Sequence, residues 1–281
     1  SIEKGVLVAG FGADQLRAID VDDAYAMDPV ALRAAVDADM AAGLIPCLVV
    51  ATVGTTSSGA VDPLVPIAEV AGPAGAWLHV DAAWAGSAAV CPEHRGILGG
   101  LEHADSYVFN PHKWLLTNFD CSAFFVADRA PLLDSLSVVP EYLRNSASDS
   151  GEVVDYRDWQ VPLGRRFRSL KLWFVLRTYG VEGLRAHIRH HVEAAGRFAE
   201  RIGVNPRLDL AAPVSLSLVC FSHVDGDAAG EELLAALNAT GEVLLTHTRL
   251  SDRYVLRLAI GGTQTTSTHV DRVADLVDRL V

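Results

Sequence analysis

Four short apolar runs in the first 130 residues constrain the fold more than any other feature of this sequence. They occupy residues 48–53, 77–81, 106–110 and 122–127, and the first three run directly into glycine or polar residues. Segments 29–42 and 65–71 carry apolar residues at helical spacing, with the first segment preceding the runs and the second lying between two of them. This alternation is typical of βαβ units and predicts an α/β fold with a mainly parallel sheet flanked by helices.

The second half of the sequence changes in pattern. Residues 170–201 are predicted to form long amphipathic helices interrupted near Gly180, followed by strands at 214–222 and 254–259 and helices at 231–239 and 269–280. The polar segment 135–151 has no useful periodicity, so we expect a mobile loop there. We therefore predict that residues 1–172 belong to a large domain that includes this loop, and that residues 173–281 form a small α+β domain.

Composition narrows the class of partner. The formal net charge of −12 disfavours nucleic acid and anionic membrane surfaces and favours a small molecule. No apolar stretch is long enough to cross a membrane, and the first residues lack the pattern of a secretory signal, so we expect a cytoplasmic protein. The four cysteines form no CxxC pair, and each is expected to be a reduced, buried side chain.

Lysine is scarce in this chain. Only Lys4, Lys113 and Lys171 are lysines, whereas the other twenty cationic side chains are arginines. Lys113 lies in the run Asn110-Pro111-His112-Lys113-Trp114, where an arginine would serve equally well as a plain positive charge. A primary amine, unlike a guanidinium, can lose its proton and condense with an aldehyde, so Lys113 is a candidate for that chemistry.

Polar residues follow three of the predicted strands at the spacing of successive βα units. Thr56 lies just after Gly54, which closes the first run. Asp81 follows 25 residues later, and Asn110 lies a further 29 residues along, just before Lys113. An amine, a carboxylate and phosphate donors are the requirements of a pyridoxal 5′-phosphate (PLP) site. Taken singly, Asp81 is also explained as a turn or helix cap, Lys113 as a surface residue and Thr56 as a turn residue.

Two motifs resemble a known family. Residues 78–87, LHVDAAWAGS, and 109–114, FNPHKW, are similar to the signature of the group II PLP-dependent amino-acid decarboxylases, the family of the aromatic-L-amino-acid decarboxylases. The resemblance continues through 118–122, NFDCS, 140–143, PEYL, and 155–171, DYRDWQVPLGRRFRSLK, and so covers essentially the whole chain.

The resemblance implies the fold type I architecture of PLP-dependent transferases and assigns cofactor-binding residues. Lys113 would bind PLP covalently, and Asp81 would pair with the pyridine nitrogen. The other residues expected around the cofactor, its ring or its phosphate are Asn110, His112, Thr56 and Ala83. Lys113, Asp81 and His112 would also take part in catalysis.

The resemblance also implies the reaction. Tyr142 falls at the position of a catalytic loop tyrosine that protonates the substrate carbon after carbon dioxide leaves, and tyrosine there favours the amine product over the aldehyde. Gly164 falls at a position where glycine accompanies bulky aromatic substrates. Trp84 replaces the tyrosine usual in animal members, next to the substrate and cofactor. The expected substrate is tryptophan, DOPA, tyrosine or phenylalanine.

Members of that family are longer than this chain. The resemblance places further phosphate-binding residues, a histidine that stacks on the cofactor ring and an N-terminal dimerisation segment upstream of Ser1. We therefore expect a homodimer, or association with a separate N-terminal chain. Two alternatives stay open: a non-catalytic fragment that needs such a partner, and an aromatic aldehyde synthase.

A metal site is a weaker interpretation. His187 and His191 stand four residues apart on a predicted helix, which is a possible ligand spacing. No acidic ligand of an HExxH motif accompanies them, so we expect a solvated helix face and no metal.

Overall fold

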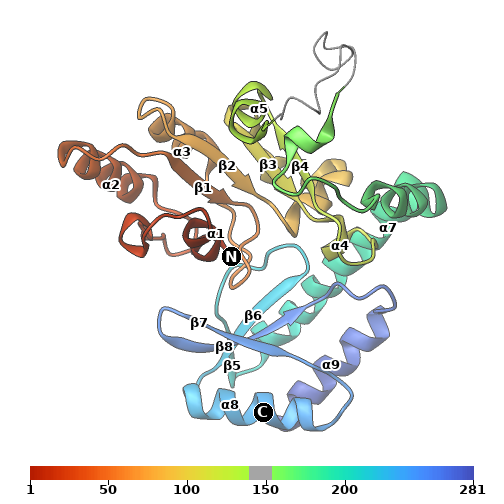
Figure 1. Ribbon diagram of the computed structural model, residues 1–281. Helices are drawn as coiled ribbons and strands as arrows, with labels where there is room; N and C mark the ends of the chain where they lie inside the picture. Colours follow the sequence, from red (N-terminus) through yellow and green to blue (C-terminus); the bar gives the residue numbers. More distant parts are fainter. Residues whose placement is uncertain (139–153) are drawn as a thin grey trace.

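The computed structural model describes residues 1–138 and 154–281. It contains two four-stranded sheets, one in each half of the chain (Figure 1). The structure confirms the predicted α/β fold, and none of the helices within the described ranges is long and apolar enough to cross a membrane.

The first sheet has the strand order β1-β2-β3-β4. Strands β1 (Leu48–Thr52), β2 (Trp77–Asp81) and β3 (Ser106–Phe109) are parallel, and β4 (Ala123–Val126) is antiparallel to β3. The mainly parallel sheet expected from the sequence is therefore present.

One face of this sheet is covered by helices. Val49, Ala51, Leu78 and Val80 point to that face and are at most 6% exposed, packed against α2 (Pro29–Ala41) and α3 (Leu64–Ala71). Burial of each large aliphatic side chain contributes about 1.5–3 kcal/mol to folding. The alternate residues Trp77, His79 and Asp81 face the other way and are only half-buried, so the polar residues of β2 share the less covered face.

Local sequence explains where α2 begins. Asp28 precedes α2, and its carboxylate accepts a hydrogen bond from the Val30 N–H at 2.8 Å, while Pro29 occupies the first helical position. The remaining short helices of the first half are α1 (Ile2–Val8), α4 (Pro111–Trp114) and α5 (Ala130–Leu136). Residues 135 and 136 thus end a helix, and most of the predicted loop lies outside the described residues.

The second sheet is antiparallel, with strand order β5-β6-β8-β7. Its strands are β5 (Leu208–Leu210), β6 (Leu218–His223), β7 (Thr246–Leu250) and β8 (Arg253–Ala259). A single apolar core joins it to the second half of α7 (Arg168–Val204), α8 (Asp227–Ala239) and α9 (Ser267–Leu280).

Helix α7 connects the two halves (Figure 1). Gly180 interrupts it with a φ of 64° and ψ of 176°, a left-handed conformation that glycine adopts without steric cost. The predicted interruption near Gly180 is confirmed. The predicted boundary between residues 172 and 173 falls inside this helix and stays a prediction.

Candidate active site

Asp81 and Asn110 lie together at the carboxyl ends of the parallel strands, where the Ala83 backbone connects them by hydrogen bonds. Asp81 Oδ1 accepts a hydrogen bond from the Ala83 N–H at 2.9 Å, and the Ala83 carbonyl accepts one from the Asn110 N–H at 2.8 Å. Asp81 also aligns with Thr52 of β1 and Val108 of β3. Three of the predicted residues therefore form one unit at the edge where α/β proteins bind ligands.

Lys113 is held on the four-residue helix α4 directly after this unit. The Lys113 N–H donates to the Asn110 carbonyl at 2.9 Å, and Pro111 begins the helix. The Lys113 side chain is exposed and forms no ion pair with any residue that the structure describes. Its apolar neighbours Trp114 and Leu115 point into the core instead, so within this chain they do not desolvate the amine.

His112 is fixed by the backbone of Cys121. Its Nδ1 lies 3.0 Å from the Cys121 nitrogen and 2.7 Å from the Cys121 oxygen, and the tautomer decides which of these hydrogen bonds forms. The Phe119 ring packs edge-on against the imidazole, with 4.9 Å between the ring centroids. Nδ1 is thus used for orientation, and Nε2 remains for a ligand.

The turn after β1 places Thr56 and is held from the other sheet. Arg257 of β8 donates to the carbonyl oxygens of Thr56 and Ser57, and Thr248 Oγ1 donates to Ser57 Oγ at 3.1 Å. Thr56 itself is exposed. Arg257 was not predicted, because no motif distinguishes it from the other nineteen arginines.

Gly54 lets this turn approach Trp84. Its φ is +81°, and an added Cβ would lie 2.5 Å from the Ala85 Cβ and 3.0 Å from Trp84 Cε3. The Trp84 ring stacks on Trp114, with 5.1 Å between centroids and 23° between planes. Trp84 therefore packs between the Thr56 turn and the lysine helix, beside the positions expected for the cofactor.

His79 shares the face of Asp81 and was also missed. Side chains two residues apart on a strand point to the same face. The position of His79 two residues before Asp81 in the run LHVD would therefore have predicted that the two side chains lie on one face. Its Nδ1 lies 2.8 Å from Ser106 Oγ. Burial lowers the pKa of His79, and the nearby Asp81 carboxylate opposes that shift. A neutral imidazole is the form expected at neutral pH.

Two predicted residues are not brought into this cluster by the described chain. Gly164 lies in an exposed segment, and an added Cβ there would meet no atom within 4 Å. Tyr142 lies outside the described residues. Their roles stay predictions.

Two expectations about side-chain burial are corrected. His191 is 1% exposed, so the predicted solvated helix face is wrong at that position. Cys91, Cys121 and Cys220 are buried as expected, but Cys47 is exposed. In the described ranges, no three His, Cys, Asp or Glu side chains are grouped as a metal site would require.

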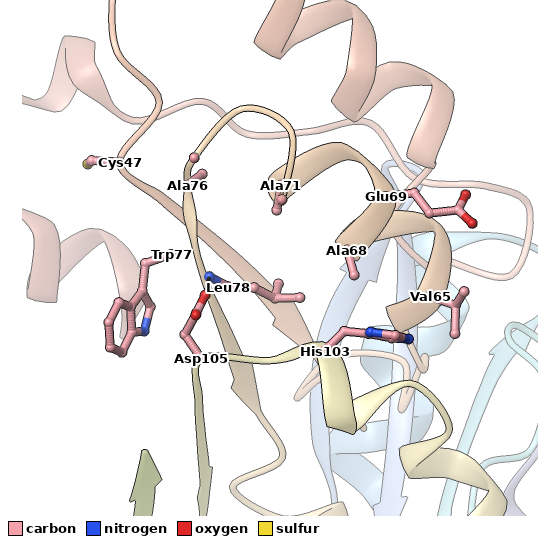
Figure 2. A pocket seen from close by; sticks show the side chains of 12 residues that line it. Cys47, Val65, Ala68, Glu69, Ala71, Ala76, Trp77, Leu78, His103 and Asp105 are labelled. Atoms are coloured by element: carbon pink, nitrogen blue, oxygen red, sulfur yellow. Dashed lines mark hydrogen bonds between the residues drawn. The ribbon is translucent and has the colours of Figure 1, made fainter. Parts of the chain in front are cut away.

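A cavity of about 660 Å³ lies at the opposite ends of the strands (Figure 2). Cys47 and Trp77 line it at the starts of β1 and β2, together with Glu69, His103 and Asp105. The Asp105 carboxylate is already an acceptor for the Leu78 N–H at 2.7 Å. None of the predicted site residues lies in this cavity.

The cluster around Asp81 fits PLP. The amide oxygen of Asn110 is buried without a hydrogen-bond partner among the described residues, which leaves an acceptor for a ligand. The Asp81 carboxylate and the exposed Lys113 amine supply the remaining chemistry that the cofactor needs. The fold and this set of groups indicate the class of PLP-dependent enzymes.

Comparison with known proteins establishes the family. Residues 1–224 match the pyridoxal-dependent decarboxylase conserved domain, so the chain belongs to this family, whose cofactor is PLP. It is 47% identical over 270 residues to the aromatic-L-amino-acid decarboxylase of Rattus norvegicus and 46% identical over 279 residues to the phenylacetaldehyde synthase of Arabidopsis thaliana. Each alignment covers 96% of this chain, and 56% and 57% of the respective relative.

A solved structure agrees. The crystal structure of Oryza sativa TDC with PLP and tryptamine has a TM-score of 0.95 and 45% sequence identity, covering 99% of this chain and 59% of that one. The structure therefore confirms the fold type I architecture. The chain spans little more than half the length of the relatives it matches.

Proposed function

We propose that the whole protein decarboxylates an aromatic L-amino acid to the corresponding amine, with PLP bound at Lys113, Asp81 and Asn110. One observation supports the proposal most directly. The Ala83 backbone forms hydrogen bonds with both the Asp81 carboxylate and the Asn110 N–H, and so holds these two residues together beside the helix of Lys113. The candidate substrates are tryptophan, DOPA, tyrosine and phenylalanine, and a relative named aromatic-L-amino-acid decarboxylase supports this class of substrate.

Each residue has a distinct task in this proposal. When bound, PLP supplies a sink for the electrons left as carbon dioxide departs. Lys113 is the amine that attaches the cofactor, and the Asp81 carboxylate holds a proton on the ring nitrogen. Asn110, His112, Thr56 and Ala83 orient the cofactor. Tyr142 delivers a proton to the substrate carbon, Gly164 leaves room for an aromatic side chain, and Trp84 packs beside the cofactor and substrate.

Exposed apolar side chains support the proposal of a homodimer. Along the first half of α7, five large side chains are between 42% and 55% exposed, namely Leu170, Trp173, Phe174, Leu176 and Tyr179. Large apolar side chains exposed in this number on one helix segment mark a binding interface more often than a free surface. We propose that a second subunit covers them.

The amine and aldehyde products separate the main proposal from its alternative. The phenylacetaldehyde synthase among the relatives keeps the alternative open, whereas Tyr142 favours the amine. The whole protein, supplied with PLP and each aromatic amino acid, is expected to release carbon dioxide and amine in equal amounts. Tyr142→Phe is expected to shift the product toward aldehyde and ammonia, with dissolved dioxygen as the oxidant.

Two controls make this assay decisive. Lys113→Ala is expected to abolish turnover, while Lys171→Ala removes the lysine paired with Asp120 at 3.9 Å and is expected to retain it. Aldehyde as the main product of the unmodified protein would favour the synthase. Absence of any product from all four amino acids would favour the non-catalytic reading.

A further inference from the structure

Trp114, the residue after Lys113, is the most constrained side chain of the lysine helix. It is 1% exposed and stacks on Trp84. On another edge its indole Nε1 donates a hydrogen bond to Nδ1 of His191 at 3.0 Å, and the two ring planes differ by 5°. His191 belongs to α7, 77 residues farther along the chain.

This hydrogen bond fixes the protonation of His191. An indole N–H only donates, so Nδ1 must carry a lone pair and the single ring proton must be on Nε2. Burial, with the neighbouring His187 and His190, lowers the pKa of His191 to about 4, while a hydrogen bond with the Gly262 backbone opposes the shift. The neutral ring that Trp114 needs is therefore the form present at neutral pH.

Trp114 and His191 are packed so tightly that neither ring can easily turn to a new partner. Ile188, Ala88 and Cys91 form a buried cluster around Trp114 and are fully buried. Among the described residues, Trp114 donates a side-chain hydrogen bond to this imidazole, and a further polar contact of the ring is with the Gly262 backbone. Loss of the acceptor would leave the indole N–H buried and unpaired.

The contacts of Trp114 connect the segments that carry the Lys113 amine and the Asp81 carboxylate. Trp114 is bonded in sequence to Lys113, and Trp84 lies three residues after Asp81. The stacked Trp84 and Trp114 rings thus join the strand that carries the carboxylate to the helix that carries the amine. His191 anchors that stack to α7, which continues into the core of the second sheet.

We propose that His191 is a positioning residue for Lys113, acting through the Trp114 N–H, and this inference rests on the function proposed above. His191 does not touch the reacting atoms. It holds α4 against α7, so that the Lys113 amine keeps a fixed position relative to Asp81.

Cofactor binding and its pH dependence test the proposal. The apoprotein is titrated with PLP while the absorbance band of the attached cofactor is followed across pH. His191→Leu is expected to weaken PLP binding by roughly tenfold, the effect of one unpaired buried donor, and to shift the pH midpoint of the band. His191→Gln keeps an acceptor and is expected to restore both quantities. His190→Gln, on the same helix without a bond to Trp114, is the matched control.

A double-mutant cycle isolates the route through Trp114. Trp114→Phe removes the N–H and keeps an aromatic ring, so it is expected to weaken binding as His191→Leu does, and adding His191→Leu to it is expected to change little more. If His191→Leu does not fold, the Trp114→Phe variant alone tests the proposal. Multiplicative effects, or an unchanged affinity and pH midpoint in His191→Leu, would overturn the proposal.

The failure of this inference and that of the proposed function are distinguishable. Borohydride reduction and peptide mapping of the unmodified protein locate the cofactor. Attachment at Lys4 or Lys171 removes the function proposed for Lys113. Attachment at Lys113 with no effect of His191 removes this inference alone.

Discussion

At the scale of single residues, the Asp81 carboxylate has one oxygen bonded to the Ala83 N–H and forms no ion pair within the described ranges. Asp81→Asn keeps an oxygen that accepts from Ala83 but loses the charge. We therefore expect amine formation to fall by about 100- to 1,000-fold, because a preorganised charge is lost. The urea midpoint of unfolding is expected to stay close to that of the unmodified protein.

Asp105→Asn is the matched control for this change. Asp105 accepts the Leu78 N–H at the opposite end of β2, in a bond of similar length, and lies far along the strand from the candidate site. It is expected to leave the rate of amine formation unchanged. Equal losses in both variants would indicate a structural effect and contradict the role of Asp81.

The site residues that follow predicted strands could be predicted from the sequence, whereas the residues that contact them from distant segments could not. Asp81, Asn110 and Lys113 follow predicted strands, and the family motifs added Ala83 and His112. Arg257 and His191 reach the site from more than 75 residues away, and nothing in their own segments indicates the partner. Their contacts depend on how the two halves of the chain pack.

At the scale of elements, the contact between α4 and α7 predicts a specific loss of stability in acid. The pKa of His191 is about 4 in the folded protein and 6.5 as a free side chain. Below pH 6.5 the unfolded chain binds a proton that the folded protein does not, so stability is full above that pH and falls as the pH drops toward 4. His191 alone is expected to lower the free energy of unfolding by about 2 kcal/mol between pH 8 and pH 5.

Urea unfolding of the unmodified protein and of His191→Gln, at pH 8 and pH 5, measures the contribution of His191 to the free energy of unfolding. The variant is expected to lose less stability on acidification, since its side chain does not titrate. The comparison avoids the range in which Arg189 and Arg168 hold the pKa values of Glu93 and Asp120 at about 2. Identical pH dependence in the two proteins would contradict a neutral, buried His191.

Elements with strong periodicity were predicted well, and irregular ones were not. Strands β1 to β4 and helices α2, α3 and α9 lie within a few residues of their expected positions. The strand expected at 214–222 begins at Leu218, because Leu216 adopts a φ of 50° that breaks the extended chain. The edge strand β5 has only three residues, and β7 has four polar residues before its one apolar residue, so neither could be distinguished from a loop.

At the scale of the whole molecule, the exposed apolar side chains in the first half of α7 predict subunit association. Phe174→Glu places a charge among them and is expected to convert a dimer to a monomer, because an unpaired charge is costly to bury. Light scattering coupled to size exclusion measures the mass. Val204→Glu, at the exposed far end of the same helix, is the control and is expected to leave the dimer intact. A monomeric unmodified protein would contradict the proposed homodimer.

Attachment of the cofactor to Lys113 is the central claim, and borohydride reduction of the PLP-loaded protein followed by peptide mapping tests it most directly. This chain has three lysines, and peptide mapping distinguishes them. We expect a reduced cofactor adduct on the peptide that contains Lys113, and loss of that adduct in Lys113→Ala. An adduct on Lys4 or Lys171, or its persistence in Lys113→Ala, would contradict the claim.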